Sequence, residues 1–151
     1  MVTFIGEYSG KMDDKGRIVF PASFKAVMPE GSTMEFVVKK NLFEDCLDIF
    51  TMEEWERQSQ EVYERLDVKF NREHDKFWRE YLRHRAVVIP DAKLGRISIP
   101  KQLLESIGIT KEVVFSGCDY KIELWAKESY TSSGLSEDEF LAIADKLSSK
   151  R

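Results

Sequence analysis

The stretch Gly16-Arg17-Ile18-Val19-Phe20-Pro21 occurs a second time, with the same pattern, as Gly95-Arg96-Ile97-Ser98-Ile99-Pro100. A second match follows it, because Leu47-Asp48-Ile49-Phe50 corresponds to Ile122-Glu123-Leu124-Trp125. The first pair is 79 positions apart and the second is 75 apart, so the first copy carries four extra residues. We place them near residues 28–32, where Pro and Gly indicate a turn. An internal repeat of this kind decides the fold, because each copy is one unit of the architecture.

Each copy predicts the same local structure, which is a strand, a Gly-containing turn, an apolar strand ending in Pro, a short helix and two more strands. The third strands are predicted at 35–38 and 112–115, and the fourth, half-buried strands at 46–50 and 121–125. A unit of about 45 residues cannot bury its own apolar face. The two copies must therefore interlock, which predicts a β-rich α+β fold with a pseudo-twofold β core flanked by helices.

The predicted domain organisation follows the repeat. The first module covers residues 3–55, two intervening helices cover 56–85, the second module covers 86–130, and a C-terminal helix and tail cover 135–151. Thr51-Met52-Glu53-Glu54 is a capping box, and Trp55, Val62 and Leu66 continue a helix from it. A second helix follows Asn71, and Ser136-Glu137-Asp138-Glu139 is a capping box that opens the last helix.

Charge is distributed unevenly along the chain, although the net charge is only −4. Residues 11–25 carry four cations against two acids, and residues 85–101 carry four against one. Residues 112–145 carry eight acids against two lysines. The two basic windows coincide with the repeated motif, so we expect them to face any polyanion and the acidic third to point away from it.

Several classes of protein are excluded by the residues that are absent. The chain shows no apolar run long enough to cross a bilayer and no secretory signal, so we expect a cytoplasmic protein. Cys46 and Cys118 are read as buried thiols, and His74 and His84 as helix-surface or packed residues, so no metal is expected. The neighbouring acids Asp13 and Asp14 lack a nucleophile or His, which argues against an enzyme and against a small-molecule substrate or cofactor.

Gly6-Glu7-Tyr8, leading into Asp13-Asp14-Lys15-Gly16-Arg17 and then Phe20-Pro21, resembles the N-terminal signature of the MraZ family, and the second motif with Gly95-Arg96 is similar to the family's second half. The match spans residues 3 to about 147. The resemblance implies two tandem AbrB-like swapped-hairpin modules and a ring-shaped homo-oligomer. It also implies sequence-specific binding to double-stranded DNA at promoter repeats upstream of the division and cell-wall gene cluster, generally as a repressor.

The two motif arginines are the leading candidates for DNA contact. Arg17 and Arg96 each follow a Gly and precede a strand, so they project from equivalent places, and Arg suits bidentate recognition of phosphate or guanine. Lys15 and Lys93 share their loops and would anchor phosphates. The remaining expected DNA-binding residues are Lys11, Lys25 and Lys101.

A carboxylate near each arginine is expected to orient its guanidinium by a charge-assisted hydrogen bond. Asp13, four positions before Arg17, matches the family. In the second loop Asp91 lies five positions before Arg96, and the aligned position is Ala92. Either Asp91 reaches the same place through a bulged turn, or the two halves contact DNA unequally.

The sequence thus predicts a DNA-binding transcriptional regulator, a repressor of the division and cell-wall genes including its own promoter, located in the cytoplasm and associated with the nucleoid. The alternative is a protein-interaction module on the same fold, such as an antitoxin-like partner binder. That alternative predicts a disordered partner-binding tail, whereas the C-terminal residues read as a capped amphipathic helix.

Overall fold

The computed structural model describes residues 2–109 and 111–149. The strands are β1 (Phe4–Lys11), β2 (Arg17–Val19), β3 (Phe36–Lys40), β4 (Leu47–Thr51), β5 (Ala86–Val88), β6 (Arg96–Ser98), β7 (Glu112–Asp119) and β8 (Ile122–Ala126). The helices are α1 (Ala22–Ala26), α2 (Met52–Glu64), α3 (Arg72–Leu82), α4 (Lys101–Ser106), α5 (Lys127–Ser132) and α6 (Glu137–Ser149).

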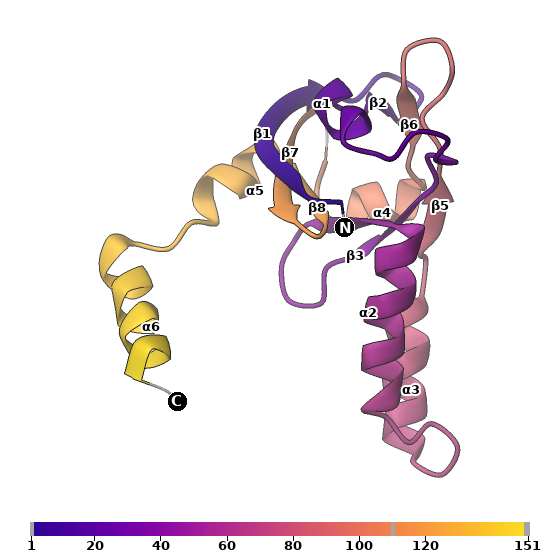
Figure 1. Ribbon diagram of the computed structural model, residues 1–151. Helices are drawn as coiled ribbons and strands as arrows, with labels where there is room; N and C mark the ends of the chain where they lie inside the picture. The colour runs from indigo at the N-terminus through magenta and orange to yellow at the C-terminus, as the bar shows by residue number, and fades with distance from the viewer. Residues whose placement is uncertain (1, 110, 150–151) are drawn as a thin grey trace.

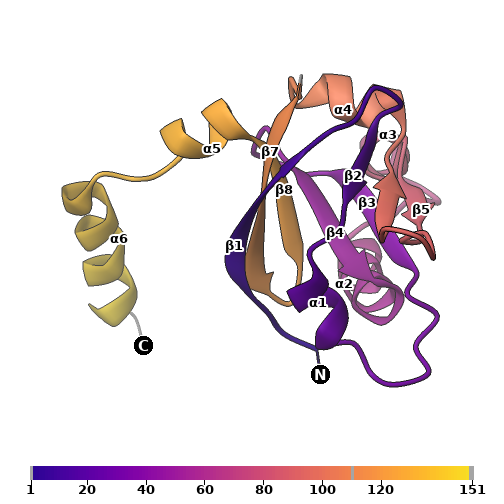
Figure 2. The ribbon, with the colours of Figure 1, turned by 90° about the horizontal axis from the view of Figure 1, so that it is seen from above.

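The larger sheet is antiparallel and runs in the order β1-β7-β8-β4-β3-β5 (Figures 1 and 2). The first strand of each copy pairs with a strand of the other copy. Strand β1 pairs along its whole length with β7 of the second copy, and β5 pairs with β3 of the first. This exchange confirms the interlocked, swapped arrangement predicted from the repeat, and the mixed α+β class with it.

Strands β2 and β6 form a separate two-stranded ribbon, in which Ile18 lies opposite Ile97. In the larger sheet Asp48 lies opposite Glu123. Both are pairs of equivalent residues in the two copies. A pseudo-twofold axis therefore passes through both pairs, and the sequence repeat is also the symmetry of the fold.

The main hydrophobic core lies between this ribbon and one face of the larger sheet. Ile18 and Ile97 are fully buried. Phe20 packs against Phe36 and Phe115, with ring centroids 4.8 and 6.0 Å apart. Each such side chain contributes about 1.5–3 kcal/mol by leaving water. One face of the ribbon therefore packs against the sheet, and its other face points outward.

The hairpin of α2 and α3 covers part of the opposite face of the sheet. Val37 and Phe50 pack there against Trp55, whose ring stacks on that of Tyr81. Strand β4 is therefore buried on both faces from Leu47 to Phe50, and the predicted half-buried alternation is wrong for this strand. The reason is that the hairpin covers the face that would otherwise meet water.

The helix boundaries largely follow the predicted caps. The Thr51 side chain accepts a hydrogen bond from the Glu54 backbone N–H, and the Asn71 side chain caps α3. Helix α2 ends at Glu64, so Leu66 lies beyond the helix that it was predicted to continue. The short helix α5 was not predicted.

Ser136 and Glu139 cap α6 reciprocally, as predicted from the sequence. No residue of α6 is buried, and the helix stands apart from the sheet (Figures 1 and 2). The extra residues of the first copy lie in the loop between α1 and β3, as predicted. Among the described residues, none of the helices has the length and apolar character needed to cross a bilayer.

The two cysteines differ in exposure. Cys46 is buried as predicted, but Cys118 is exposed, so that prediction is wrong. Cys118 lies near the end of β7, on the face opposite to the core residues Val113 and Phe115.

Candidate nucleic-acid interface

The turn between β1 and β2 is organised by one carboxylate. Oδ1 of Asp13 accepts hydrogen bonds from the backbone N–H groups of Lys15 at 3.0 Å and Arg17 at 2.8 Å. Oδ2 of Asp13 accepts a bond from Nε of Arg17 at 2.8 Å. The same side chain thus fixes the turn and the guanidinium group that leaves it.

The turn before β6 repeats this arrangement with one more residue. Oδ1 of Asp91 accepts bonds from the N–H groups of Leu94 at 2.9 Å and Arg96 at 3.2 Å, and Oδ2 accepts a bond from Nε of Arg96 at 2.7 Å. The backbone N–H of the aspartate donates to the arginine carbonyl at 2.9 Å in both turns. The longer loop absorbs the extra residue, so Asp91 reaches Arg96 although Ala92 holds the aligned position.

Backbone conformation explains the glycine that precedes each arginine. Gly16 and Gly95 have φ values of +77° and +70°, in the left-handed region that favours glycine. The N–H groups that bond to the carboxylates lower the pKa of both aspartates, with the Arg17 N–H first for Asp13 and the Leu94 N–H first for Asp91. Both aspartates therefore stay ionised at neutral pH and hold the arginine Nε.

Both arginines lie on the outward face of the ribbon. Side chains alternate along a strand, and Ile18 and Ile97 point into the core. Arg17 and Arg96 therefore point away from it, in register with Ser98 and Val19 respectively. The two arginines are offset by two positions along the strand and by one strand across the ribbon. Their Cα atoms are therefore about 8 Å apart. Among the described residues, their terminal Nη nitrogens make no hydrogen bond, so these remain available to a ligand.

Three of the predicted DNA-binding lysines lie in or beside the two turns. Lys15 and Lys93 are exposed within the turns. Lys25 of α1 lies against the second turn, because a Cβ added to Gly95 would be 2.5 Å from its Nζ. The equivalent neighbour of Gly16 is Leu104, at 3.6 Å. The second turn thus has an additional cation that the first lacks.

Two predicted lysines lie elsewhere. Gly10 faces the core, so Lys11 points to the opposite face of the sheet, where it shares a shallow pocket with Glu112 and Lys127. Lys101 begins α4 and pairs with Glu105 at 3.7 Å. The structure does not bring either lysine onto the outward face of the ribbon.

Sequence reasoning missed two residues on this face. Val19 is 52% exposed between the motif arginine and the buried Phe20, and Ser98 is exposed opposite Arg17. Strand alternation around Ile18 and Ile97 could have identified both, because each lies one position from a fully buried residue.

A polar cluster at the centre of the larger sheet is the candidate metal site. Atoms of Cys46, Asp48 and Glu123 that could bind an ion lie within 4.8 Å of one another. However, Nζ of Lys121 lies 2.8 Å from Asp48 and 3.0 Å from Glu123. One ammonium group thus already pairs with both carboxylates, and burial raises the pKa of the Cys46 thiol far above its ordinary value. A lysine therefore lies where a metal ion would have to bridge the two carboxylates.

Comparison with known proteins gives one consistent result. The family described as "MraZ protein, putative antitoxin-like" matches residues 3–77 and 82–146, once for each copy of the repeat. A protein of Bacteroides fragilis named transcriptional regulator MraZ is 38% identical over 128 residues, which is 85% of this chain and 80% of the relative.

Further relatives carry the same name. The protein of Bacteroides thetaiotaomicron is 34% identical over 97% of this chain and 93% of its own length. That of Dictyoglomus thermophilum is 33% identical over 97% of this chain and 94% of its own. The similarity covers both copies of the motif and the helices between them.

Proposed function

Because the chain belongs to the MraZ family, we propose that it is a sequence-specific DNA-binding transcriptional regulator. It acts without enzymatic chemistry, in the cytoplasm at the nucleoid, as a repressor of the division and cell-wall gene cluster including its own promoter. The observation that carries the proposal is the pair of aspartate-held arginines, Arg17 and Arg96, on the outward face of one ribbon.

The dimensions of the ribbon suit the major groove of DNA. That groove is about 12 Å wide and admits a two-stranded β-ribbon, and arginine is the side chain that most often reads guanine there. Arginines about 8 Å apart fit within it. With each Nε held by a carboxylate, less side-chain entropy is lost when the Nη atoms bind a base or phosphate. Lys15, Lys93 and Lys25 flank the arginines as phosphate anchors.

Two short turns supply limited electrostatic affinity in a chain of net charge −4. A ring-shaped homo-oligomer would present several ribbons to successive promoter repeats, and linked sites gain about 10² to 10⁴ in apparent affinity. Self-assembly is therefore part of the proposed function.

The test is a titration of the DNA upstream of the protein's own gene, with a scrambled fragment as control, at fixed salt. Arg17→Ala and Arg96→Ala should each weaken specific binding by about 1–3 kcal/mol. Arg83→Ala is the matched control, because Arg83 is an exposed arginine at the end of α3, outside the ribbon, and is paired with Glu80. If both ribbon variants bind as tightly as the unchanged protein, the ribbon is not the DNA surface. Absence of binding to either fragment would favour the protein-interaction alternative.

A further inference from the structure

Strands β2 and β6 place four side chains on the outward face of the ribbon, in two rows. Arg17 lies opposite Ser98 in one row, and Val19 lies opposite Arg96 in the other. Side chains directly opposite each other have their Cβ atoms about 5 Å apart, and the two rows are about 7 Å apart along the strands. The pseudo-twofold axis relates the two arginines to each other, and it relates Val19 to Ser98. The arginines therefore follow the symmetry of the repeat, whereas the other pair breaks it.

The ion pairs of the two turns draw the guanidinium groups away from the centre of this face. Asp13 belongs to the turn before β2, and Asp91 belongs to the turn before β6. Because the two strands are antiparallel, these turns lie at opposite ends of the ribbon. Each arginine Nε is held at its own end, so Val19 and Ser98 occupy the middle of the face. Two short side chains there can approach the same groove that the arginines enter.

Val19 is the apolar member of the central pair. It is 52% exposed, although its neighbours Ile18 and Phe20 are fully buried. A β-branched side chain has few rotamers, so its methyl groups lose little entropy when they meet a ligand. The apolar group that base edges present in the major groove is the C5-methyl group of thymine. An amino group of cytosine or adenine placed against Val19 would lose water without gaining a hydrogen-bond acceptor.

Ser98 offers different chemistry from the equivalent place in the second copy. Its hydroxyl group donates and accepts hydrogen bonds, so it can meet the polar edge of any base. Ser98 therefore selects little, whereas Val19 selects for a methyl group. Successive bases of one DNA strand are about 3.4 Å apart, so the spacing of the two rows corresponds to about two base steps. The base that Val19 meets lies within about two steps of the bases that the arginines read.

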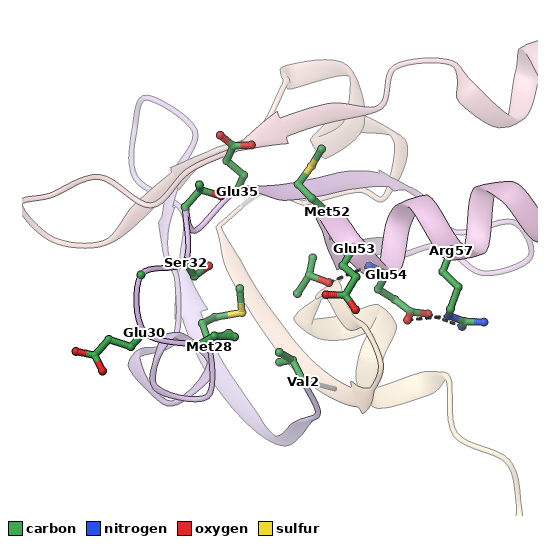
Figure 3. A pocket seen from close by; sticks show the side chains of 13 residues that line it. Val2, Met28, Glu30, Ser32, Glu35, Met52, Glu53, Glu54 and Arg57 are labelled. Carbon is green, nitrogen blue, oxygen red and sulfur yellow. Dashed lines mark hydrogen bonds and ion pairs between the residues drawn. The ribbon is translucent and has the colours of Figure 1, made fainter.

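A concave surface elsewhere on the chain is acidic and does not suit DNA. It is a cavity of about 470 Å³ between the α1–β3 loop and the first turns of α2 (Figure 3). Glu30, Glu35 and Glu53 line it and make no ion pair among the described residues. These carboxylates repel a phosphate backbone. The outward face of the ribbon therefore remains the surface on which contacts with bases are expected.

We propose that Val19 is a specificity-determining residue of the DNA surface. It selects thymine, through contact with the C5-methyl group, within about two base steps of a guanine read by an arginine. Ser98 makes no such selection, so the two halves of the ribbon read different bases although their arginines are related by symmetry. This inference rests on the proposed function and deepens it, because it assigns one base to one side chain of the same surface.

The first measurement is a titration of the DNA upstream of the protein's own gene, with one thymine at a time replaced by deoxyuridine, which lacks only the C5-methyl group. At the thymine that Val19 contacts, the unchanged protein should bind about fourfold more weakly, as expected for the loss of one buried methyl group. Val19→Ser should bind the two DNAs equally. Val19→Thr should keep the difference, because the threonine methyl group also contacts thymine.

The second measurement uses the converse variant and a control. Ser98→Val should show a preference for thymine over deoxyuridine at a second position, when each base of the site is replaced in turn by one or the other. Val87→Ser is the matched control, because Val87 is 55% exposed in β5, outside the ribbon. It should respond to deoxyuridine like the unchanged protein. Val19→Ser should still fold, because the second copy already carries serine at the equivalent position of its strand.

Three results would overturn the inference. These are an unchanged protein that binds every deoxyuridine fragment as tightly as the original DNA, a Val19→Ser chain that keeps the same sensitive thymine, and a Ser98→Val chain with no second one. The arginine variants separate this inference from the proposed function. If Arg17→Ala weakens binding while no thymine methyl group matters, only the role of Val19 is refuted. If Arg17→Ala and Arg96→Ala both bind like the unchanged protein, the ribbon is not the DNA surface and the proposed function fails.

Discussion

Replacing Lys121 by Met tests how the centre of the fold is held together. Asp48 and Glu123 face each other across β4 and β8, and Lys121 bonds to both. Burial opposes the charge of Lys121, but the two carboxylates raise its pKa above its ordinary value of 10.5. Its contribution to stability is thus complete below the unfolded pKa and is lost only as pH rises through the higher folded value. The Met side chain keeps the aliphatic packing and removes the charge.

The expected loss of stability follows from the distance between the two carboxylates. Without the ammonium, two carboxylates within 4.8 Å repel by about 3 kcal/mol at an effective dielectric constant near 20. The Asp48 side chain is 9% exposed and that of Glu123 is 18% exposed, so water screens the pair only in part. We expect Lys121→Met to lower the free energy of unfolding by about 2–3 kcal/mol at pH 8. Adding Glu123→Gln should restore roughly half of this loss, because one of the repelling charges is then absent.

The assay is urea unfolding followed by tryptophan fluorescence, at one protein concentration, between pH 5 and 8. In the variant, repulsion raises the pKa of one carboxyl group in the folded state above its unfolded value. That group gains a proton on folding at lower pH, so the deficit against the unchanged protein should shrink as pH falls. A deficit below about 0.5 kcal/mol, or an equal deficit at pH 5 and 8, would refute the reasoning.

Three further outcomes are expected. Gly117→Ala should destabilise the protein by about 1–3 kcal/mol in the same unfolding assay, because its Cβ would lie 2.6 Å from the Phe4 backbone; an unchanged midpoint would contradict this packing. Lys25→Ala should reduce the slope of log affinity against log salt by about one for operator and scrambled DNA alike, and a loss confined to the operator would mean that Lys25 reads bases. Iodoacetamide added to the native protein and followed by mass spectrometry should label Cys118 first, because Cys46 is buried and burial raises the pKa of its thiol; equal labelling rates would contradict the structure.

Local chemistry made much of the candidate site predictable. Gly16 and Gly95 mark turns because a positive φ is easily reached without a side chain, and Pro21 and Pro100 mark helix starts because the first turn needs no N–H donor. Asp13 could be paired with Arg17 from spacing and family resemblance. These features depend on residues within about five positions of one another, so the sequence alone carries them.

The geometry of the second turn could not be predicted in this way. The sequence left open whether the Asp91 carboxylate could bond to Arg96, because Ala92 occupies the position equivalent to Asp13. The added residue changes the path of the loop, and the carboxylate still meets Nε at 2.7 Å. The asymmetry between the halves arises instead from Lys25 and Leu104, which approach the turns from helices of the opposite copy.

The sequence by itself determined the repeat, the order of local elements, the capped helices and the motif arginines, since each depends on neighbouring residues or on a comparison of the chain with itself. The tertiary structure decided which strands exchange partners, that β4 is buried on both faces, and that Lys11 lies on the other side of the sheet from Arg17. These facts depend on contacts between residues far apart in the chain, whose formation is governed by burial of the whole apolar surface rather than by the preferences of any one segment.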